Sequence, residues 1–330
     1  MTVVPTDTAP SSPYIADFMT RPLRIGTRGS RLALWQAHWV RDALAALPEA
    51  PAVEIVTIST AGDRIQDVAL SQVGGRDFFT KDIESALLDD AVDLAVHSLK
   101  DLATDMPAGL MLGAVMPRED PRDALVSTKG ETLESLPHGA RVGTSSLRRR
   151  AFARALRPDL TLLELRGNVP TRLERLEQGD YDAVILATAG LVRLELGTHI
   201  TERLDPEVFT PAPAQGTVGI QVREGDEATQ RWVSALNHAA TRRAIGAERR
   251  LLQVVEGGCQ APVGAWAREL DGQMVLTARV ASLDGREAVS CTERGGPDAP
   301  EALGERLAQR LLDEGAADIL AGIRSHGSTT

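Results

Sequence analysis

The chain has 330 residues, of which 43% are hydrophobic, 25% charged and 3% aromatic, and its formal net charge is −10 at pH 7. This composition is typical of a globular protein with two or three domains, and no apolar run approaches the ~20 residues of a membrane span. Cys259 and Cys291 lie too far apart for a disulfide framework or a metal-binding spacing, and the six histidines are scattered, so we expect no metal.

Residues 1–20 are rich in Pro, Ser and Thr and lack the basic start and apolar core of a signal peptide. We therefore expect a disordered tail and a cytoplasmic protein. A strand at Arg24–Thr27 and a turn at Arg28–Ser30 then lead into a helix. Apolar residues recur there at steps of three and four, which predicts one buried face made of Leu32, Trp35, Trp39, Ala43 and Leu47.

The segment that begins at Arg141 repeats this design, with a strand at Arg141–Thr144, a turn at Ser145–Ser146 and a helix. Each half continues through a second strand, a helix and a strongly apolar strand, at 53–59, 79–90 and 93–97, and at 160–165, 170–178 and 182–186. Continuously apolar strands are typical of buried parallel sheets. The pattern predicts two doubly wound α/β domains.

Two segments interrupt the pattern and are expected to cross between the domains. Residues 117–127 combine two prolines with dense charge, and Pro211–Gly216 contains two more prolines. From about 237 onward, a helix at 242–255 is followed by alternating strands near 262–268, 273–282 and 287–294 and by a helix from about 300. We expect domain 1 at 21–116 with 217–236 returning to it, domain 2 at 117–216, and a small α/β domain 3 at 237–330.

Nine arginines but only three acidic residues fall between Arg141 and Arg175, a charge of 9 − 3 = +6 in an acidic chain. Like charges concentrate in this way when an anionic partner is bound. Several of these arginines flank loops, where a guanidinium can pair with carboxylate or phosphate groups. Only three of the 36 basic residues are lysines, so arginine is also the ordinary cation of this chain. That preference explains the residue type but not the clustering.

The pentapeptide His97–Asp101 places Ser98, Lys100 and Asp101 just past a predicted strand. Among so many cations Asp101 should stay ionised, and it could hold N–H donors or stabilise a cationic intermediate. The alternative is that Asp101 only begins a turn. His97 belongs to the apolar strand and is expected to be a packing residue.

Cys259 lies on a predicted loop, Glu256–Pro262, in which two glycines precede it and a proline marks the end. A loop cysteine near cations is of the reactive kind, although a structural or incidental cysteine fits the loop equally well. Cys291 lies in an alternating strand and is expected to pack. No Gly-x-Ser-x-Gly motif supports a serine hydrolase.

Eight segments in order give the chain a resemblance to the porphobilinogen deaminase (hydroxymethylbilane synthase) family from about residue 22 to the C-terminus. They are RIGTRGSRLALWQA, DLAVHSLKD, PREDPRDALVS, VGTSSLRRR, LRGNVPTRL, DAVILATAGLVRL, PAPAQGTVGIQ and EGGCQAP. The resemblance implies a transferase of porphyrin, tetrapyrrole and haem biosynthesis. It also implies three domains, the first two resembling periplasmic binding proteins, and a monomer.

Such an enzyme joins four porphobilinogen molecules head to tail with loss of ammonia and releases hydroxymethylbilane by hydrolysis. By similarity Cys259 carries a dipyrromethane cofactor through a thioether, and Asp101 is the catalytic residue, which contacts the pyrrole N–H groups and stabilises the azafulvene cation. The resemblance assigns cofactor binding to Lys100, Thr144, Ser146, Arg148, Arg149 and Arg172. It assigns substrate binding to Arg28, Ser30, Ser98, Arg166, Arg193 and Gln215.

Two residues and one segment depart from the family pattern. Arg31 stands where a proline is usual, and Gln72 stands where a lysine is common. The segment 74–79 departs from the usual Gly-Gly-Lys-Gly pattern of a mobile lid. Two other classes of protein share some of these features. A solute-binding protein would share the duplicated halves and the anion site, but it would normally be exported and has no need of the Cys259 loop. A nucleic-acid binder is disfavoured by the acidic chain and the few aromatic residues.

Overall fold

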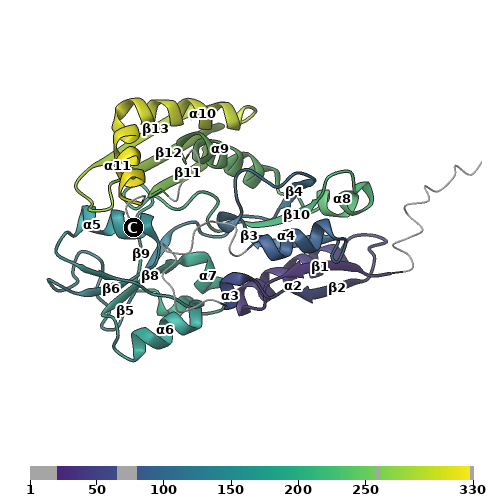
Figure 1. The fold of residues 1–330 in the computed structure, drawn as a ribbon, viewed down its shortest axis with the longest axis horizontal. Coiled ribbons are helices and arrows are strands. Elements are labelled where there is room, and N and C mark those ends of the chain that lie inside the picture. Colours follow the sequence, from purple (N-terminus) through teal and green to yellow (C-terminus); the bar gives the residue numbers. More distant parts are fainter. Residues whose placement is uncertain (1–20, 65–79, 257–260, 328–330) are drawn as a thin grey trace, which may run out of the picture.

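Two five-stranded sheets and one three-stranded sheet organise the computed structural model, which describes residues 21–64, 80–256 and 261–327 (Figure 1). The fold is mixed α/β. Each sheet with its helices is called a unit here, numbered in chain order. The predicted tail at 1–20, the departures at 72–79 and Cys259 lie outside the described residues.

The first unit has the strand order β2-β1-β3-β10-β4. Its strands are β1 (Leu23–Thr27), β2 (Val53–Thr57), β3 (Leu94–Ser98), β4 (Leu110–Val115) and β10 (Val218–Arg223). Its helices are α2 (Arg31–Ala45), α3 (Ala61–Arg64), α4 (Lys81–Leu88) and α8 (Glu227–Ser234), and a 3-10 turn, η2 (Leu99–Asp101), follows β3.

The second unit repeats this arrangement in the order β7-β6-β8-β5-β9. Its strands are β5 (Asp123–Ser127), β6 (Arg141–Gly143), β7 (Thr161–Leu163), β8 (Ala183–Ala187) and β9 (Glu202–Arg203). Its helices are α5 (Leu147–Leu156), α6 (Val169–Glu177) and α7 (Thr188–Arg193), followed by the 3-10 turn η3 (Gly197–His199).

Neither of these sheets is wholly parallel. The strands β2, β1 and β3 run parallel, as do β7, β6 and β8, but β10 and β5 join them in the opposite direction. The apolar runs 93–97 and 182–186 are buried strands as predicted, yet each is parallel to only one neighbour. The prediction of a crossing over the whole of 117–127 was wrong, because Asp123–Ser127 forms the buried strand β5.

The face that α2 buries also differs from the predicted one. Its fully buried residues are Gln36, Ala37, Val40 and Leu44, whereas Trp35 is 36% exposed. The apolar positions from Leu32 to Leu47 form a stripe beside this face, and Trp39, Ala43 and Leu47 pack against the core only in part. Both stripes have helical spacing, and contact with β1 and β3 selects the one that is buried.

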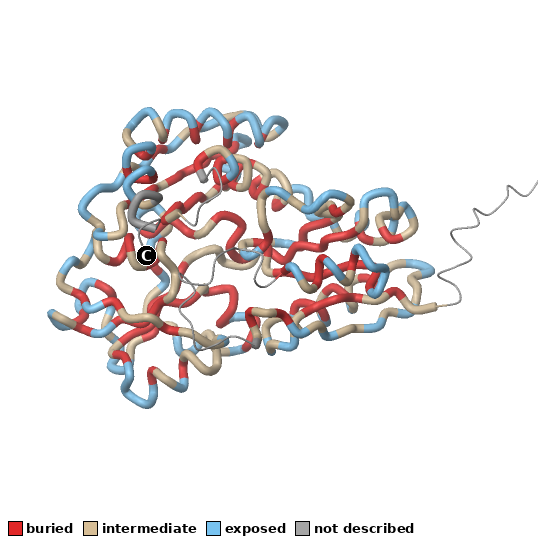
Figure 2. Tube along the Cα trace, in the orientation of Figure 1, coloured by how far each residue is buried: buried red, intermediate tan, exposed pale blue. Residues whose placement is uncertain are grey.

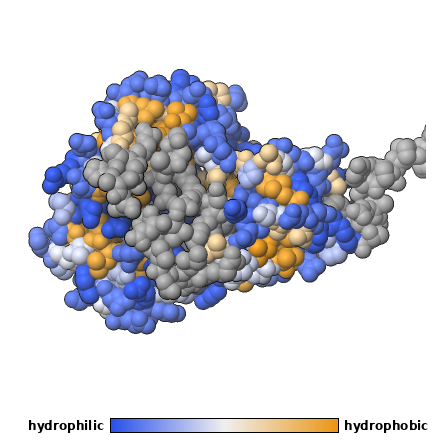
Figure 3. Space-filling view, viewed as in Figure 1, coloured by the Kyte–Doolittle hydropathy of each residue, from blue (hydrophilic) through white to orange (hydrophobic). Residues whose placement is uncertain are grey.

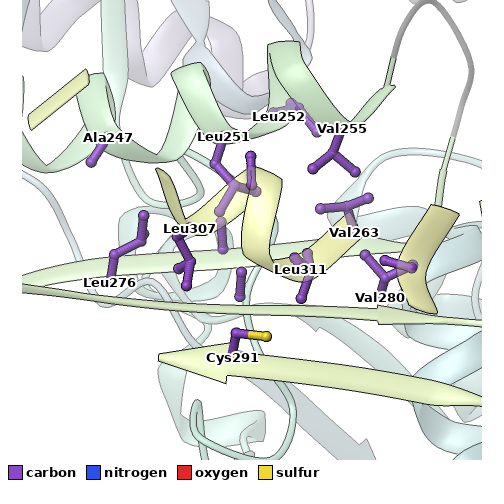
Figure 4. Packing of buried hydrophobic residues seen from close by; sticks show 14 of the residues in the cluster. Ala247, Leu251, Leu252, Val255, Val263, Leu276, Val280, Cys291, Leu307 and Leu311 are labelled. Carbon is purple, nitrogen blue, oxygen red and sulfur yellow. The ribbon is translucent and has the colours of Figure 1, made fainter. Parts of the chain in front are cut away.

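The third unit is a three-stranded antiparallel sheet covered by helices. It consists of α9 (Ala239–Glu256), β11 (Val263–Leu270), β12 (Gln273–Ala281), β13 (Ala288–Gly295), α10 (Pro300–Leu311), the π-helical turn η4 (Leu312–Ala316) and α11 (Ala317–Gly327). Figure 4 shows side chains of both α9 and α10 packed against the sheet, with Cys291 at its edge. The predicted elements of this region and the packing role of Cys291 are confirmed.

The buried residues lie mainly along the strands of the three sheets. Figure 2 shows buried chain along the strands and exposed chain on the outer turns of the helices. The described residues on the visible face in Figure 3 are mainly hydrophilic, with smaller hydrophobic areas between them. Within the described ranges, no helix is long and apolar enough to cross a membrane.

Candidate active site

A cavity of about 720 Å³ opens where the first and second units face each other. The carboxyl ends of the parallel strands meet there, as expected for ligand sites in doubly wound sheets. Three helices also begin at the cavity wall, each with a side chain that caps its N-terminus. Ser30, Ser146 and Asn168 accept backbone N–H bonds at α2, α5 and α6. These N-termini add partial positive charge to the wall.

The cavity brings together most of the residues that the sequence predicts for the site. Those on its wall are Arg28, Ser30, Ser98, Lys100, Asp101, Ser146, Arg148, Arg149, Arg166, Arg172, Arg193 and Gln215. Thr144 is fully buried behind the wall, where its hydroxyl accepts the Ser146 N–H at 3.3 Å. It supports the loop before α5 but does not line the cavity.

Lys100 and Arg172 are the cavity cations that most need a partner. Lys100 donates to the amide oxygen of Gln215 at 3.2 Å, and Arg172 donates to the backbone oxygen of Gly167 at 2.8 Å. Among the residues described, neither forms an ion pair with a carboxylate. Burial, helped by the charge of Arg149, lowers the pKa of Lys100 to about 8 and that of Arg172 to about 10. A bound anion would restore the favourable electrostatics of both groups.

Arg148 and Arg149 are held differently, by the buried carboxylate of Asp123. Its oxygens lie 2.7 Å from Arg148 Nη1 and 2.8 Å from Arg149 Nη2. Burial alone would raise the pKa of Asp123, but the charges of Arg148 and Arg149 hold it far below its usual range. The cluster keeps one net positive charge, and its two guanidinium groups are fixed in place before any ligand binds.

Asp123 was not among the predicted site residues. Three acidic residues stand close together in the segment PREDPRD, and nothing in their spacing marks one of them as buried. The apolar run Ala124–Val126 directly after Asp123 was the available signal, because it makes Asp123 the first residue of a buried strand.

Four other predicted residues lie in different environments. Arg28 pairs with Asp63 on the cavity wall, and Asp101 is exposed on the same wall. Ser98 exchanges hydrogen bonds with the buried Gln36 of α2. Arg193 is buried, donates to the backbone oxygen of Gly216 at 2.7 Å, and has its pKa lowered by burial to about 10.

His97 is a packing residue, as predicted. It is buried next to Gln221 of β10, with 3.0 Å between its Nε2 and Oε1 of that amide. Burial lowers the pKa of His97 to about 4 against the opposing effect of this hydrogen bond. The ring is therefore neutral at pH 7 and supports the strand that leads to Lys100 and Asp101.

The described part of the chain contains no group of three or more His, Cys, Asp or Glu side chains that could hold a metal ion. The described wall of the cavity instead offers guanidinium, ammonium, hydroxyl and helix N-terminal N–H groups beside the exposed carboxylate of Asp101. This combination suits an organic ligand with several carboxylate groups and a part that becomes positively charged.

Family models match two parts of the chain. Residues 23–231 match the porphobilinogen deaminase dipyrromethane cofactor binding domain, and residues 243–313 match the porphobilinogen deaminase C-terminal domain. Porphobilinogen deaminase of Desulforudis audaxviator is 52% identical over 93% of this chain and 99% of its own length. That of Moorella thermoacetica is 48% identical over 92% of this chain and 97% of its own length.

Solved structures resemble the fold at low identity. The VFT2 domain of Bordetella pertussis BvgS is 12% identical and covers 73% of this chain and 97% of its own, with a TM-score of 0.41. An ancestral cationic amino acid solute binding protein is 15% identical and covers 68% of this chain and 92% of its own, also with a TM-score of 0.41.

Proposed function

The chain belongs to the porphobilinogen deaminase family, and on this premise we propose that it joins four porphobilinogen molecules head to tail and releases hydroxymethylbilane by hydrolysis. The protein is an enzyme, a transferase of tetrapyrrole biosynthesis with a dipyrromethane cofactor binding domain. The observation that best supports the reaction is the pair of cavity cations, Lys100 and Arg172, that have no carboxylate partner among the described residues.

The residues present fit a dipyrromethane. Its acetate and propionate groups need cations that are not already neutralised, and the wall offers Lys100 and Arg172 in that state. Arg148 and Arg149 add one net charge and have fixed orientations. These four residues, with Ser146 at the N-terminus of α5 and Thr144 behind it, would hold the cofactor. When bound, it supplies the pyrrole position to which the first substrate molecule is joined.

The substrate would meet the other part of the wall. Arg28, Ser30, Ser98, Arg166 and Arg193 would bind its carboxylate groups. The exposed carboxylate of Asp101 would accept pyrrole N–H bonds and stabilise the positive charge that remains on the substrate when ammonia leaves. Preorganised charge at this point favours the transition state over the ground state, which is what catalysis requires.

The thioether anchor of the cofactor is assigned to Cys259 by its place in the Gly-Gly-Cys-Gln motif. Cys259 follows the end of α9 at Glu256 by three residues. The other cysteine, Cys291, is unsuited to attachment, because burial and its hydrogen bond to Glu314 raise the pKa of its thiol to about 11. A thiol held in its protonated form is a poor nucleophile.

Intact mass under denaturing conditions tests the proposal. We expect a mass above that of the bare chain and a colour reaction with an acidic pyrrole reagent. The Cys259→Ser protein should lose both together with activity, whereas Cys291→Ser should keep them. Loss of the extra mass in Cys291→Ser alone would overturn the assignment, and a bare mass in the unmodified protein would favour a reversible solute-binding role.

The same proposal includes the organisation of the chain and its setting. Domain 1 would comprise 21–116 and 217–236, domain 2 would comprise 117–216, and domain 3 would comprise 237–330. The protein would act on a small molecule as a cytoplasmic monomer.

A further inference from the structure

The side-chain amide of Gln215 has all of its hydrogen-bonding positions occupied by the protein itself. Its Oε1 accepts from Lys100 Nζ at 3.2 Å and from Arg149 Nη2 at 3.4 Å. Its Nε2 donates to the backbone oxygen of Pro121 at 2.8 Å and to Asp123 Oδ1 at 3.0 Å. A primary amide has two donor hydrogens and two acceptor lone pairs, so no capacity remains for a ligand. Gln215 is also 1% exposed.

These four partners come from different parts of the fold. Lys100 follows β3 in the first unit, while Asp123 begins β5 and Arg149 lies on α5 in the second unit. Gln215 itself lies on the segment that returns from the second unit to the first. Its amide thus links a cation of the first unit to a fixed group of charges in the second unit.

We propose that Gln215, oriented by Asp123 behind it, is a positioning residue rather than a substrate ligand. It sets both the position and the protonation state of the Lys100 amino group. A lysine ammonium ends a flexible four-carbon chain, so an acceptor is needed to hold it at one point. The amide is suited to this task because it can accept from Lys100 and donate to Asp123 at the same time. A carboxylate could not donate to Asp123.

Besides the Gln215 acceptor, which lies 3.2 Å from its Nζ, Lys100 is faced by two negative and two positive groups. The groups that face it are Asp101 on its own turn, Asp123 on β5, and Arg148 and Arg149 on α5. Burial and the charge of Arg149 bring the pKa of Lys100 down to about 8. A change at residue 215 should therefore move the titration of Lys100 in a direction set by the new side chain.

The chain has only three lysines, which makes the titration of Lys100 measurable. Protein labelled with 13C at lysine Cε should give three NMR signals, and Lys81→Arg and Lys129→Arg variants assign the two exposed ones. Gln215→Glu adds a negative charge beside Lys100 and should raise its titration midpoint by about one pH unit or more. Gln215→Met removes the acceptor and should lower the midpoint. Lys81 and Lys129 should not move in either variant.

Gln221→Met is the matched control, because it also removes a buried amide with two side-chain hydrogen bonds. It should lower the melting temperature without moving the Lys100 midpoint. An unchanged Lys100 midpoint in both Gln215 variants, or shifts in the same direction, would overturn the proposal. The function of the lysine rests on the proposed reaction, but its titration does not. Repeating the measurement in Cys259→Ser separates a failure of this inference from a failure of cofactor attachment.

Discussion

Arg193 of α7 lies over the indole ring of Trp35 of α2, with its guanidinium carbon 5.6 Å from the ring centre. The same guanidinium lies 5.8 Å from the ring centre of Trp39, and the two indoles are 5.5 Å apart. Arg193 therefore joins the second unit to the first through cation–π contacts. Because it is buried, these contacts are of the stronger kind, on the order of 2 kcal/mol.

Replacing Arg193 by Met keeps the length of the side chain but removes its charge. We expect Arg193→Met to weaken the contact between the two units, with a loss of about 2 kcal/mol in the free energy of unfolding. The tryptophan fluorescence of this variant should also change, because the guanidinium group next to Trp35 and Trp39 is absent. Arg231→Met is the control, because the exposed Arg231 lies over Trp232 at 5.5 Å. Equal losses of stability in both variants would refute a special role of Arg193.

Asp101→Asn separates chemistry from binding. The amide keeps the size and hydrogen-bonding ability of the carboxylate but not its charge, so only the charged transition state should suffer. We expect turnover to fall by roughly 10²–10³ or more, with little change in cofactor attachment or substrate affinity. Single-turnover release of ammonia is the measurement, since slow motion of the units could otherwise hide a chemical defect.

Two further variants serve as controls for Asp101→Asn. Asp101→Glu should retain part of the activity, because it restores the charge at a different distance. Asp105→Asn, outside the cavity, should release ammonia at the normal rate. Normal release from Asp101→Asn would leave Asp101 with no role beyond starting a turn.

The buried His97 should make the protein sensitive to mild acid. Its folded pKa of about 4 lies below the ordinary value of 6.5, so the unfolded chain binds the proton more readily. Stability should be constant above about pH 6.5, fall by roughly 3 kcal/mol as the pH drops to about 4, and not fall further from this cause. Urea unfolding at pH 4, 5, 6 and 7 measures the slope.

His97→Asn should flatten this part of the stability curve, while His199→Asn should not, because His199 is exposed. The loss below pH 4 should persist in both proteins. There the ion-paired Asp93, whose pKa the hydrogen bonds of Arg24 and Arg21 hold at about 2 against the effect of burial, takes up its proton. A His97→Asn protein that keeps the full slope between pH 4 and 6.5 would show that another group causes it.

Gly285 docks the third unit on the helix that carries Arg148 and Arg149. A Cβ at this position would lie 2.6 Å from the backbone nitrogen of Ala155, and Gly285 has a φ of +74°. Gly272 has the same φ and nothing within 4 Å. Gly272→Ala should thus cost only backbone strain, about 1–2 kcal/mol. Gly285→Ala should cost clearly more in chemical denaturation, because the turn must move away from α5. Equal costs would show that the docking is loose.

Much of the fold follows from local sequence. Ser30, Ser146 and Asn168 each cap a helix at a loop that the sequence marks, and the third unit has its predicted order of elements. Strand direction was not predictable in this way, because an apolar run such as Val184–Leu186 has the same pattern beside a parallel or an antiparallel neighbour. The fold settles it through contacts between distant segments.

The site, too, was predictable only where it depends on local sequence. Arginines clustered beside predicted loops indicated the cationic wall of the cavity. The partners of those arginines were hidden, because Asp123 lies 92 residues from Gln215 and 26 from Arg149. Such pairs leave no spacing in the sequence. The cations are visible locally, whereas the groups that orient them are defined only by the folded chain.

The chain passes twice between the first and second units, and the two passages lie against each other. The Met116 N–H donates to Val218 O at 3.0 Å, and the Glu119 N–H donates to Gly216 O at 3.1 Å. Gly216 has a φ of +88°, and a Cβ there would collide with the Glu119 oxygen. Two chain segments that hydrogen bonds join side by side bend out of their common plane more readily than within it. Relative motion of the units should then be confined to one swinging direction, so that the two walls of the cavity part and meet again in the same alignment.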